Sequence, residues 1–221
     1  MSFFPAMPAR WRQAAAIFAS VAAILVSVGT GGAAAVPHSA ADRETVARIE
    51  AWLNGMRTMR SPFVQTSSNG GIAEGTIWLS RPGKLRIDYR PPNPMQIYTQ
   101  GMWLVYIDRE LEEVNQVPLK STPAAYLVRE DIALSGDVEV EQVTRRRGTV
   151  SVHLSQTGDT DAGRLIMTFA EQPLALRGWT VVDAQGVETT VTLVGPRVNA
   201  ALEPGVFDFP APDWAPEPQR E

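Results

Sequence analysis

The spacing of hydrophobic and polar positions changes near residue 60, from a helical to a strand-like period. Between Ala41 and Met59, apolar residues recur every three or four positions, which predicts one amphipathic helix. We expect Asp42 to cap its start and Pro62 to end the segment. The apolar stripe of this helix consists of Val46, Ile49, Leu53, Met56 and Met59.

Beyond Pro62, apolar and polar residues alternate in short runs that Gly, Pro and Asn interrupt, which predicts β-strands. A second, short helix is predicted to start at Thr122-Pro123. Long antiparallel meanders curl because strands twist. The predicted fold is therefore mainly β (α+β), an antiparallel open half-barrel of about ten or eleven strands whose concave face is covered by the two helices.

One charged residue falls in line with an apolar face. Ile77 and Leu79 point to one side of their strand, and Arg81 has the same parity. A guanidinium that faces a dry interior is costly unless it is hydrogen-bonded, and its five donors suit unpaired carbonyl groups at a helix C-terminus. Two interpretations stay open: Arg81 is a solvated turn residue, or it binds the end of a helix.

The segment "MWLVYID" is apolar at both parities, with Leu104 and Tyr106 on one side and Val105 and Ile107 on the other. A strand buried on both faces explains this pattern. A strand that lines a cavity and packs with its other face explains it equally well.

Composition limits the functional classes. The 221 residues are 44% hydrophobic and 20% charged with a net charge of -4, which is typical of a globular domain. Nucleic-acid binding usually requires a concentrated basic surface, so we predict no nucleic-acid partner. The chain has no cysteine, so it can form no disulfide and has no thiol for a lipid anchor.

The N-terminus has the features of a secretory signal peptide: arginines, an uncharged run from Ala14 to Val28, and the small residues Ala33-Ala34-Ala35. We predict removal of residues 1–35, with Ala40 as a second possible cleavage position. An uncleaved membrane anchor is the alternative, but the apolar run is shorter than the roughly 20 residues that span a bilayer.

Residues 36–221 are predicted to form a single domain outside the cytoplasm. Its last residues, 211–221, form a Pro-rich tail.

Catalytic and metal-binding patterns are weak. His153 alternates with apolar residues and is expected to face solvent, which argues against a Ser-His-Asp triad. Asp159 and Asp161 resemble the start of a calcium loop, but no glutamate follows at the required spacing. The acidic cluster Glu110, Glu112 and Glu113 is better explained by a hairpin tip than by an acid/base pair. We therefore predict no enzyme, no cofactor and no metal site.

Several segments together resemble the LolA family of periplasmic lipoprotein carriers. They are "GTIWLSRPGKLRIDY", "TQGMWLVYIDRELEEVNQV", "STPAAYLV", the "FVQ" after the first helix, and a closing set of Asn199, Leu202, Phe207, Phe209 and Pro210. The resemblance extends over roughly Ala41 to Pro210. One departure is Gln100-Gly101, where the family usually has Asp-Gly.

The resemblance implies a soluble periplasmic chaperone that binds the acyl chains of lipoproteins in an apolar cavity. Such a carrier takes acylated lipoproteins from an inner-membrane LolCDE-type ABC transporter to a LolB-type receptor or to the outer membrane itself. It also implies that Arg81 gates the cavity, that Leu85 and Ile87 line it, and that Tyr126 to Val128 form a lid. The lack of cysteine favours the carrier over LolB, which is itself a lipoprotein, and we expect a monomer.

Alternation and resemblance together predict one set of site residues. The lipid-binding and gating residues are Arg81, Ile77, Leu79, Leu85, Ile87, Tyr89, Ile97 and Leu104, and the lid-helix residues are Ile49, Leu53, Tyr126, Leu127 and Val128. Three alternatives are a LolA-fold carrier of another lipid, an RseB-like domain that senses lipid or protein, and a secreted enzyme. An RseB-like sensor usually has a second domain, and an enzyme requires clustered titratable residues inside the cavity.

Overall fold

A computed structural model describes residues 39–122, 124–157 and 159–209, without the side chains of residues 159–162. The predicted signal peptide, the Pro-rich tail, Pro123 and Pro210 lie outside the described residues, as do the side chains of Asp159 and Asp161.

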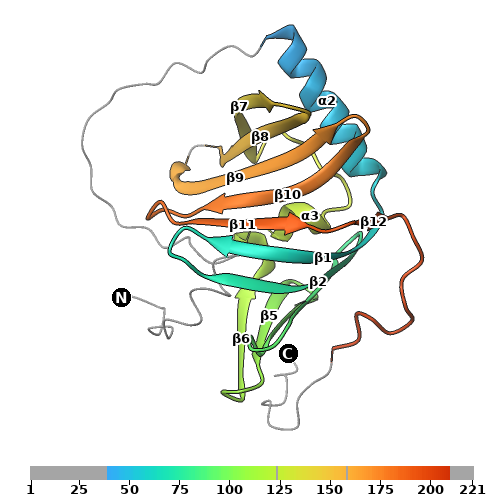
Figure 1. The fold of residues 1–221 in the computed structure, drawn as a ribbon, viewed down its shortest axis with the longest axis vertical. Coiled ribbons are helices and arrows are strands. Elements are labelled where there is room, and N and C mark those ends of the chain that lie inside the picture. The colour runs from blue at the N-terminus through green and yellow to red at the C-terminus, as the bar shows by residue number, and fades with distance from the viewer. Residues whose placement is uncertain (1–38, 123, 158, 210–221) are drawn as a thin grey trace. The chain divides into compact units, whose positions relative to one another are not determined.

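Strands dominate the described chain, with two α-helices and one 3-10 turn among them (Figure 1). The helical elements are α2 (Ala40–Gly55), η1 (Leu119–Ser121) and α3 (Ala124–Val128). The strands are β1 (Thr58–Ser67), β2 (Ile72–Ser80), β3 (Lys84–Tyr89), β4 (Met95–Gln100), β5 (Trp103–Asp108), β6 (Glu113–Pro118), β7 (Val138–Arg146), β8 (Thr149–Gln156), β9 (Asp159–Glu171), β10 (Leu174–Val182), β11 (Glu188–Leu193) and β12 (Arg197–Val198).

The sheet order is β6-β5-β4-β3-β2-β1-β11-β10-β9-β8-β7, and β12 pairs with β1. Strands β2 to β6 run antiparallel to their neighbours, and so do β7 to β11. The order has two ends, so the sheet is open. The mainly β, open antiparallel prediction is confirmed, with twelve strands in place of ten or eleven.

The chain forms two compact parts that share β1. We call one the α2 part, which contains α2, Gln65–Ile72 and Asp131–Leu193. The other is the α3 part, whose described residues include Met56–Val64, those of Ala73–Glu130 and residues 194–209. Each part thus has its own helix and its own set of neighbouring antiparallel strands.

Helix α2 is shorter than its apolar stripe predicted. It ends at Gly55, a residue type that is unfavourable inside helices. Met56 and Met59 are buried as expected, but they lie beyond the helix, and Met59 belongs to β1. The prediction that Pro62 ends the helical segment is wrong as well, because Pro62 lies inside β1 and its carbonyl accepts the N–H of Val194.

Ser39, not Asp42, caps the start of α2. The Ser39 hydroxyl accepts the backbone N–H of Asp42 at 3.1 Å, and the Asp42 carboxylate accepts the backbone N–H of Ser39 at 3.3 Å. This reciprocal pair is a capping box, in which the acidic residue stands three positions after the cap. The N-cap prediction failed because the helix starts at Ala40, before Asp42.

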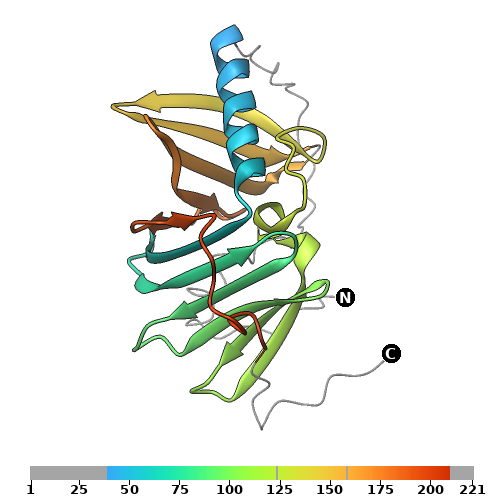
Figure 2. The ribbon, with the colours of Figure 1, turned by 90° about the vertical axis from the view of Figure 1, so that its right-hand side faces the viewer.

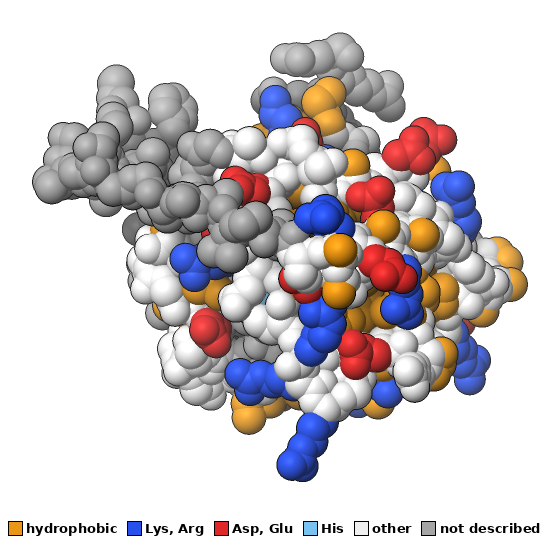
Figure 3. Space-filling view, turned by 90° about the horizontal axis from the view of Figure 1, so that it is seen from above, with side chains coloured by type: hydrophobic (Ala, Val, Ile, Leu, Met, Phe, Trp, Pro, Cys, Tyr) orange, Lys and Arg blue, Asp and Glu red, His pale blue; other side chains and the backbone are white. Residues whose placement is uncertain are grey.

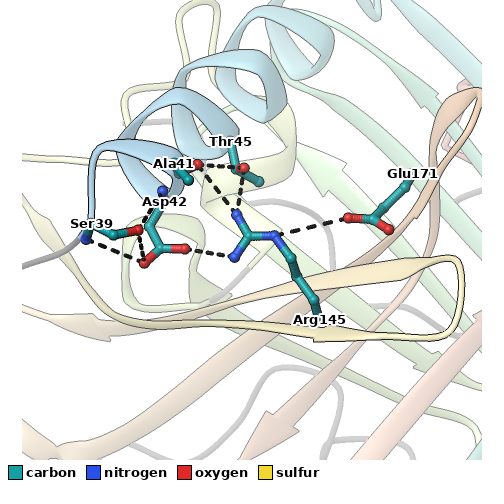
Figure 4. A network of polar contacts seen from close by, with 6 residues as sticks. All are labelled: Ser39, Ala41, Asp42, Thr45, Arg145 and Glu171. Atoms are coloured by element: carbon teal, nitrogen blue, oxygen red, sulfur yellow. Dashed lines mark hydrogen bonds and ion pairs between the residues drawn. The ribbon is translucent and has the colours of Figure 1, made fainter.

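Arg145 of β7 connects the start of α2 to the sheet of the same part (Figure 4). Its guanidinium donates to Asp42 Oδ1 at 2.7 Å and to Thr45 Oγ1 at 2.7 Å, and its Nε lies 4.0 Å from Glu171 Oε1. The hydrogen bond from Arg145, followed by that from Ser39, lowers the pKa of Asp42 below its ordinary value of 3.8.

Further along α2, apolar contacts replace these polar ones. The Trp52 ring meets Phe169 of β9 edge-on, with 5.7 Å between ring centroids, and Ile49 and Leu53 are fully buried. Helix α2 therefore lies against the apolar side of the sheet in its own part (Figure 2). His153 has the opposite parity from the buried Val152 and Leu154; it is partly exposed and within 3.2 Å of the Thr144 hydroxyl.

Charges of both signs are mixed on the surface. The face in Figure 3 shows basic and acidic side chains interspersed among scattered apolar ones. Arg164 pairs with Glu141 at 3.1 Å, and Arg90 with Glu74 at 3.0 Å. In the described part of the chain, neither helix has the length and apolarity that crossing a membrane demands.

We expect Asp42→Asn to destabilise the protein in a pH-dependent way. The pKa of Asp42 is lowered by folding, so its contribution is present above the unfolded pKa of about 3.9 and is lost as the pH falls through the lower folded value. Urea unfolding at pH 7 should show the variant to be less stable than the wild type, and the difference should shrink as the pH drops below about 4. Glu44→Gln, at an exposed position on the same helix, is the control. A difference that stays constant with pH would refute the role of Asp42.

Candidate functional site

The apolar residues predicted to bind lipid share one face of the α3 part. Ile77, Ile87 and Ile97 stand opposite one another on β2, β3 and β4, and Leu79 stands opposite Leu85. We call this surface the Arg81 face, because Arg81 follows β2 with the same parity. Its apolar members are at most 8% exposed: Ile77, Leu79, Leu85, Ile87, Tyr89, Ile97 and Leu104.

The opposite face of the same strands is covered by the chain near its described C-terminal end. Tyr98, Val105 and Ile107 form a buried cluster against Phe209, whose ring meets that of Tyr98 at 5.7 Å and 86°. Arg86 Nη1 donates to the carbonyl of Val206 at 2.9 Å. Strand β5 is thus buried on both faces in this structure.

Arg81 is 6% exposed, so it is not a solvated turn residue. Its Nε donates to the carbonyl of Arg129 at 2.6 Å, Nη2 to that of Glu130 at 2.8 Å, and Nη1 to that of Met56 at 3.0 Å. Arg129 and Glu130 directly follow α3, where carbonyl groups lack partners within the helix. The planar guanidinium binds three acceptors from two distant segments, which an ammonium group could not match in geometry.

The main chain of the β2–β3 turn reinforces this contact. The N–H of Arg81 donates to the carbonyl of Arg57 at 2.8 Å, and the N–H of Gly83 donates to the carbonyl of Val128, the last residue of α3, at 2.8 Å. Gly83 has φ = 80°, a left-handed conformation that a side chain would disfavour. The turn therefore contacts the end of α3 through both its side chain and its backbone.

The chain after α3 is also bound within the α2 part, by two residues that the sequence analysis missed. The Asn54 amide accepts the N–H of Ile132 and donates to its carbonyl, both at 2.8 Å. Glu50, one turn earlier on α2, accepts the N–H of Leu134 at 2.9 Å. Their i, i+4 spacing places them on one helix face, but nothing in the sequence indicated which backbone groups they bind.

The predicted lid residues differ in exposure. Leu127 and Val128 of α3 are buried, whereas Tyr126 is half-buried and stacks under the Arg129 guanidinium at 4.4 Å. Ile49 and Leu53 belong to α2, in the other part. Before α3, the Thr122 hydroxyl donates back to the carbonyl of Leu119.

Titratable groups on the Arg81 face are phenols. Burial raises the pKa of Tyr106 and, together with the nearby Tyr106, that of Tyr89. Both side chains therefore stay protonated at neutral pH. Among the described residues, no three His, Cys, Asp or Glu side chains are grouped as a metal site would need.

The acidic cluster lies at a hairpin tip, as the sequence analysis favoured. Glu110, Glu112 and Glu113 are exposed at the β5–β6 turn. The turn is stabilised by Asp108 Oδ1, which accepts the N–H groups of Glu110 and Leu111.

Comparison with known proteins points to one family. Residues 54–210 match the family described as "Outer membrane lipoprotein carrier protein LolA". An outer-membrane lipoprotein carrier protein of Methylococcus capsulatus is 28% identical over 183 residues, which cover 79% of this chain and 87% of the relative. The protein of the same name from Chromohalobacter salexigens is 27% identical over 199 residues, covering 86% and 94%. A solved LolA superfamily structure from Nitrosomonas europaea has 8% identity and a TM-score of 0.39, and covers 73% of this chain and 96% of that one.

We expect Arg81→Leu to loosen the segment around α3. The variant leaves three carbonyl groups without their charged donor, and each lost bond of this type costs about 1.5–3 kcal/mol before relaxation. Amide hydrogen exchange in residues 124–130 should accelerate by roughly tenfold or more. Arg86→Leu is the matched control, because Arg86 binds Asp88 and Val206 on the opposite face. Unchanged exchange in Arg81→Leu would contradict this role.

Proposed function

Because the chain belongs to the LolA family of outer membrane lipoprotein carrier proteins, we propose that it carries acylated lipoproteins across the periplasm, from the inner to the outer membrane. On this proposal it is a binding protein rather than an enzyme. Its partners are an inner-membrane LolCDE-type ABC transporter as donor and a LolB-type receptor, or the outer membrane, as acceptor.

The observation that carries this proposal is the position of Arg81. The residue lies at the end of the apolar Arg81 face and binds carbonyl groups that follow α3. Backbone carbonyls are acceptors that a lipopeptide can also supply, through its amide and ester groups. We propose that α3 is a lid, that these hydrogen bonds close it, and that they break when acyl chains enter.

The magnitudes suit a carrier that must also release its cargo. Burial of an acyl chain gains about 0.8 kcal/mol per CH₂, so a sixteen-carbon chain gains on the order of 12 kcal/mol. Opening the lid breaks the two hydrogen bonds from the Arg81 guanidinium to the carbonyls that follow α3, which costs several kcal/mol. The apparent affinity equals the affinity of the open form multiplied by the fraction of molecules whose lid is open. Binding is therefore tight but still reversible at the acceptor.

Depletion of the protein in its own cells tests the proposal. We expect outer-membrane lipoproteins to accumulate in the inner membrane, as measured by membrane fractionation and immunoblotting. Re-expression of the wild-type chain should restore their localisation. Normal sorting after complete removal would exclude the carrier function.

We expect Arg81→Leu to accept cargo and fail to deliver it. Without lid closure to compete with the ligand, the variant should bind lipoproteins released from spheroplasts but keep them when outer-membrane vesicles are added. The measurement is the fraction of labelled lipoprotein transferred to the vesicles. Arg86→Leu, which changes an arginine on the opposite face, should transfer like the wild type. Full transfer by Arg81→Leu would show that Arg81 is not the gate.

A further inference from the structure

One polar group on the Arg81 face has no role in the account above: the hydroxyl of Tyr106. The side chain is 2% exposed, and its Oη atom is buried without a hydrogen-bond partner in the described structure. Buried hydroxyl groups are normally paired, because burial removes their hydrogen bonds to water without replacement. An unpaired buried donor that lies on the proposed ligand-binding face is therefore available to a ligand acceptor.

Tyr106 stands at the β5 end of the apolar row, and Asn115 of β6 faces it on the other side. It is opposite Ile97 on β4, which is opposite Ile87 on β3, which is in turn opposite Ile77 on β2. Facing residues of neighbouring strands lie on the same side of a sheet. Tyr106 is therefore a hydrogen-bond donor at the end of the row of side chains assigned to acyl-chain contact.

We propose that Tyr106 Oη donates a hydrogen bond to a carbonyl oxygen of the bound acyl group, in an ester or an amide. The inference rests on the proposed function, because it requires an acyl chain on the Arg81 face. A saturated chain has no acceptor along its length, and the carbonyl at its head is the strong acceptor that it brings. A phenol that stays protonated supplies the matching donor.

This contact makes the site specific for acyl over alkyl chains. A pocket that offers a buried donor disfavours an analogue without the acceptor, because the donor then stays unpaired. It also sets the depth of the ligand, since the carbonyl must reach Tyr106 while the hydrocarbon extends along the isoleucine row.

Tyr98 provides a matched control. Its hydroxyl is also buried without a hydrogen-bond partner in the described residues, and it lies on the neighbouring strand β4. Its side chain has the opposite parity from Ile97 and packs against Phe209, away from the Arg81 face. Removal of either hydroxyl should affect folding in a similar way, but only Tyr106 should affect the ligand.

The experiment compares Tyr106→Phe and Tyr98→Phe with the wild type. Binding is measured by calorimetry with a synthetic lipopeptide that carries two palmitoyl esters, with its dialkyl ether counterpart, and with an N-palmitoyl peptide. We expect the wild type and Tyr98→Phe to prefer the ester over the ether by about fivefold. Tyr106→Phe should bind both equally, and the N-palmitoyl arm shows whether an amide carbonyl also serves.

Infrared spectra of ligand labelled with ¹³C at the carbonyl give a second readout. The carbonyl band should shift to lower frequency on binding to the wild type and to Tyr98→Phe, and the shift should be lost with Tyr106→Phe. A preference or band shift that survives in Tyr106→Phe overturns the assignment. Equal binding of ester and ether by the wild type overturns it too, while leaving the carrier proposal intact. Failure of the wild type to bind any of the three probes overturns the carrier proposal itself.

Discussion

The α3 part depends on the hydrogen bonds that the guanidinium of Arg81 donates to backbone carbonyls. A buried charge is costly, and here three backbone carbonyls offset that cost. Two of these bonds satisfy the carbonyls of Arg129 and Glu130. These groups lie past the end of α3, where carbonyls lack N–H partners within the helix. Removing either side leaves the other unpaired, so the turn after β2 and the chain after α3 stabilise each other.

The two faces of the same strands have different covers. Phe209 and the chain before it pack on one face and bind Arg86, so that face is closed by apolar contact and a cation together. On the Arg81 face, hydrogen bonds run from the β2–β3 turn to backbone carbonyls. Hydrogen bonds to carbonyl groups can be exchanged for bonds to a ligand's carbonyls, whereas a packed aromatic ring has no such substitute. The proposed lid and the proposed Tyr106 contact both rely on this exchange of equivalent acceptors.

Much of the fold followed from local pattern, because alternation and turn residues act over a few positions. The parity of Ile77 and Leu79 predicted the face on which Arg81 lies. The absence of cysteine meant that no disulfide could stabilise the fold. The errors arose where local signals were ambiguous. Met56 and Met59 continue the helical period of the residues before them, but the helix ends at Gly55, and Met59 is buried as part of the alternation of β1. Pro62 looked like a helix stop but is accommodated in β1.

By itself, the sequence determined which side chains share a face, since backbone geometry sets that parity residue by residue. It also placed Arg81 in phase with the apolar face of β2, but it left open whether the guanidinium is solvated or binds the end of a helix. Only the tertiary structure decided what that guanidinium binds, because its partners lie 25, 48 and 49 residues away along the chain. The unpaired hydroxyl of Tyr106 and the amide pairing of Asn54 with Ile132 were equally hidden, because a hydrogen bond, or its absence, depends on which distant groups the fold brings within 3 Å or so.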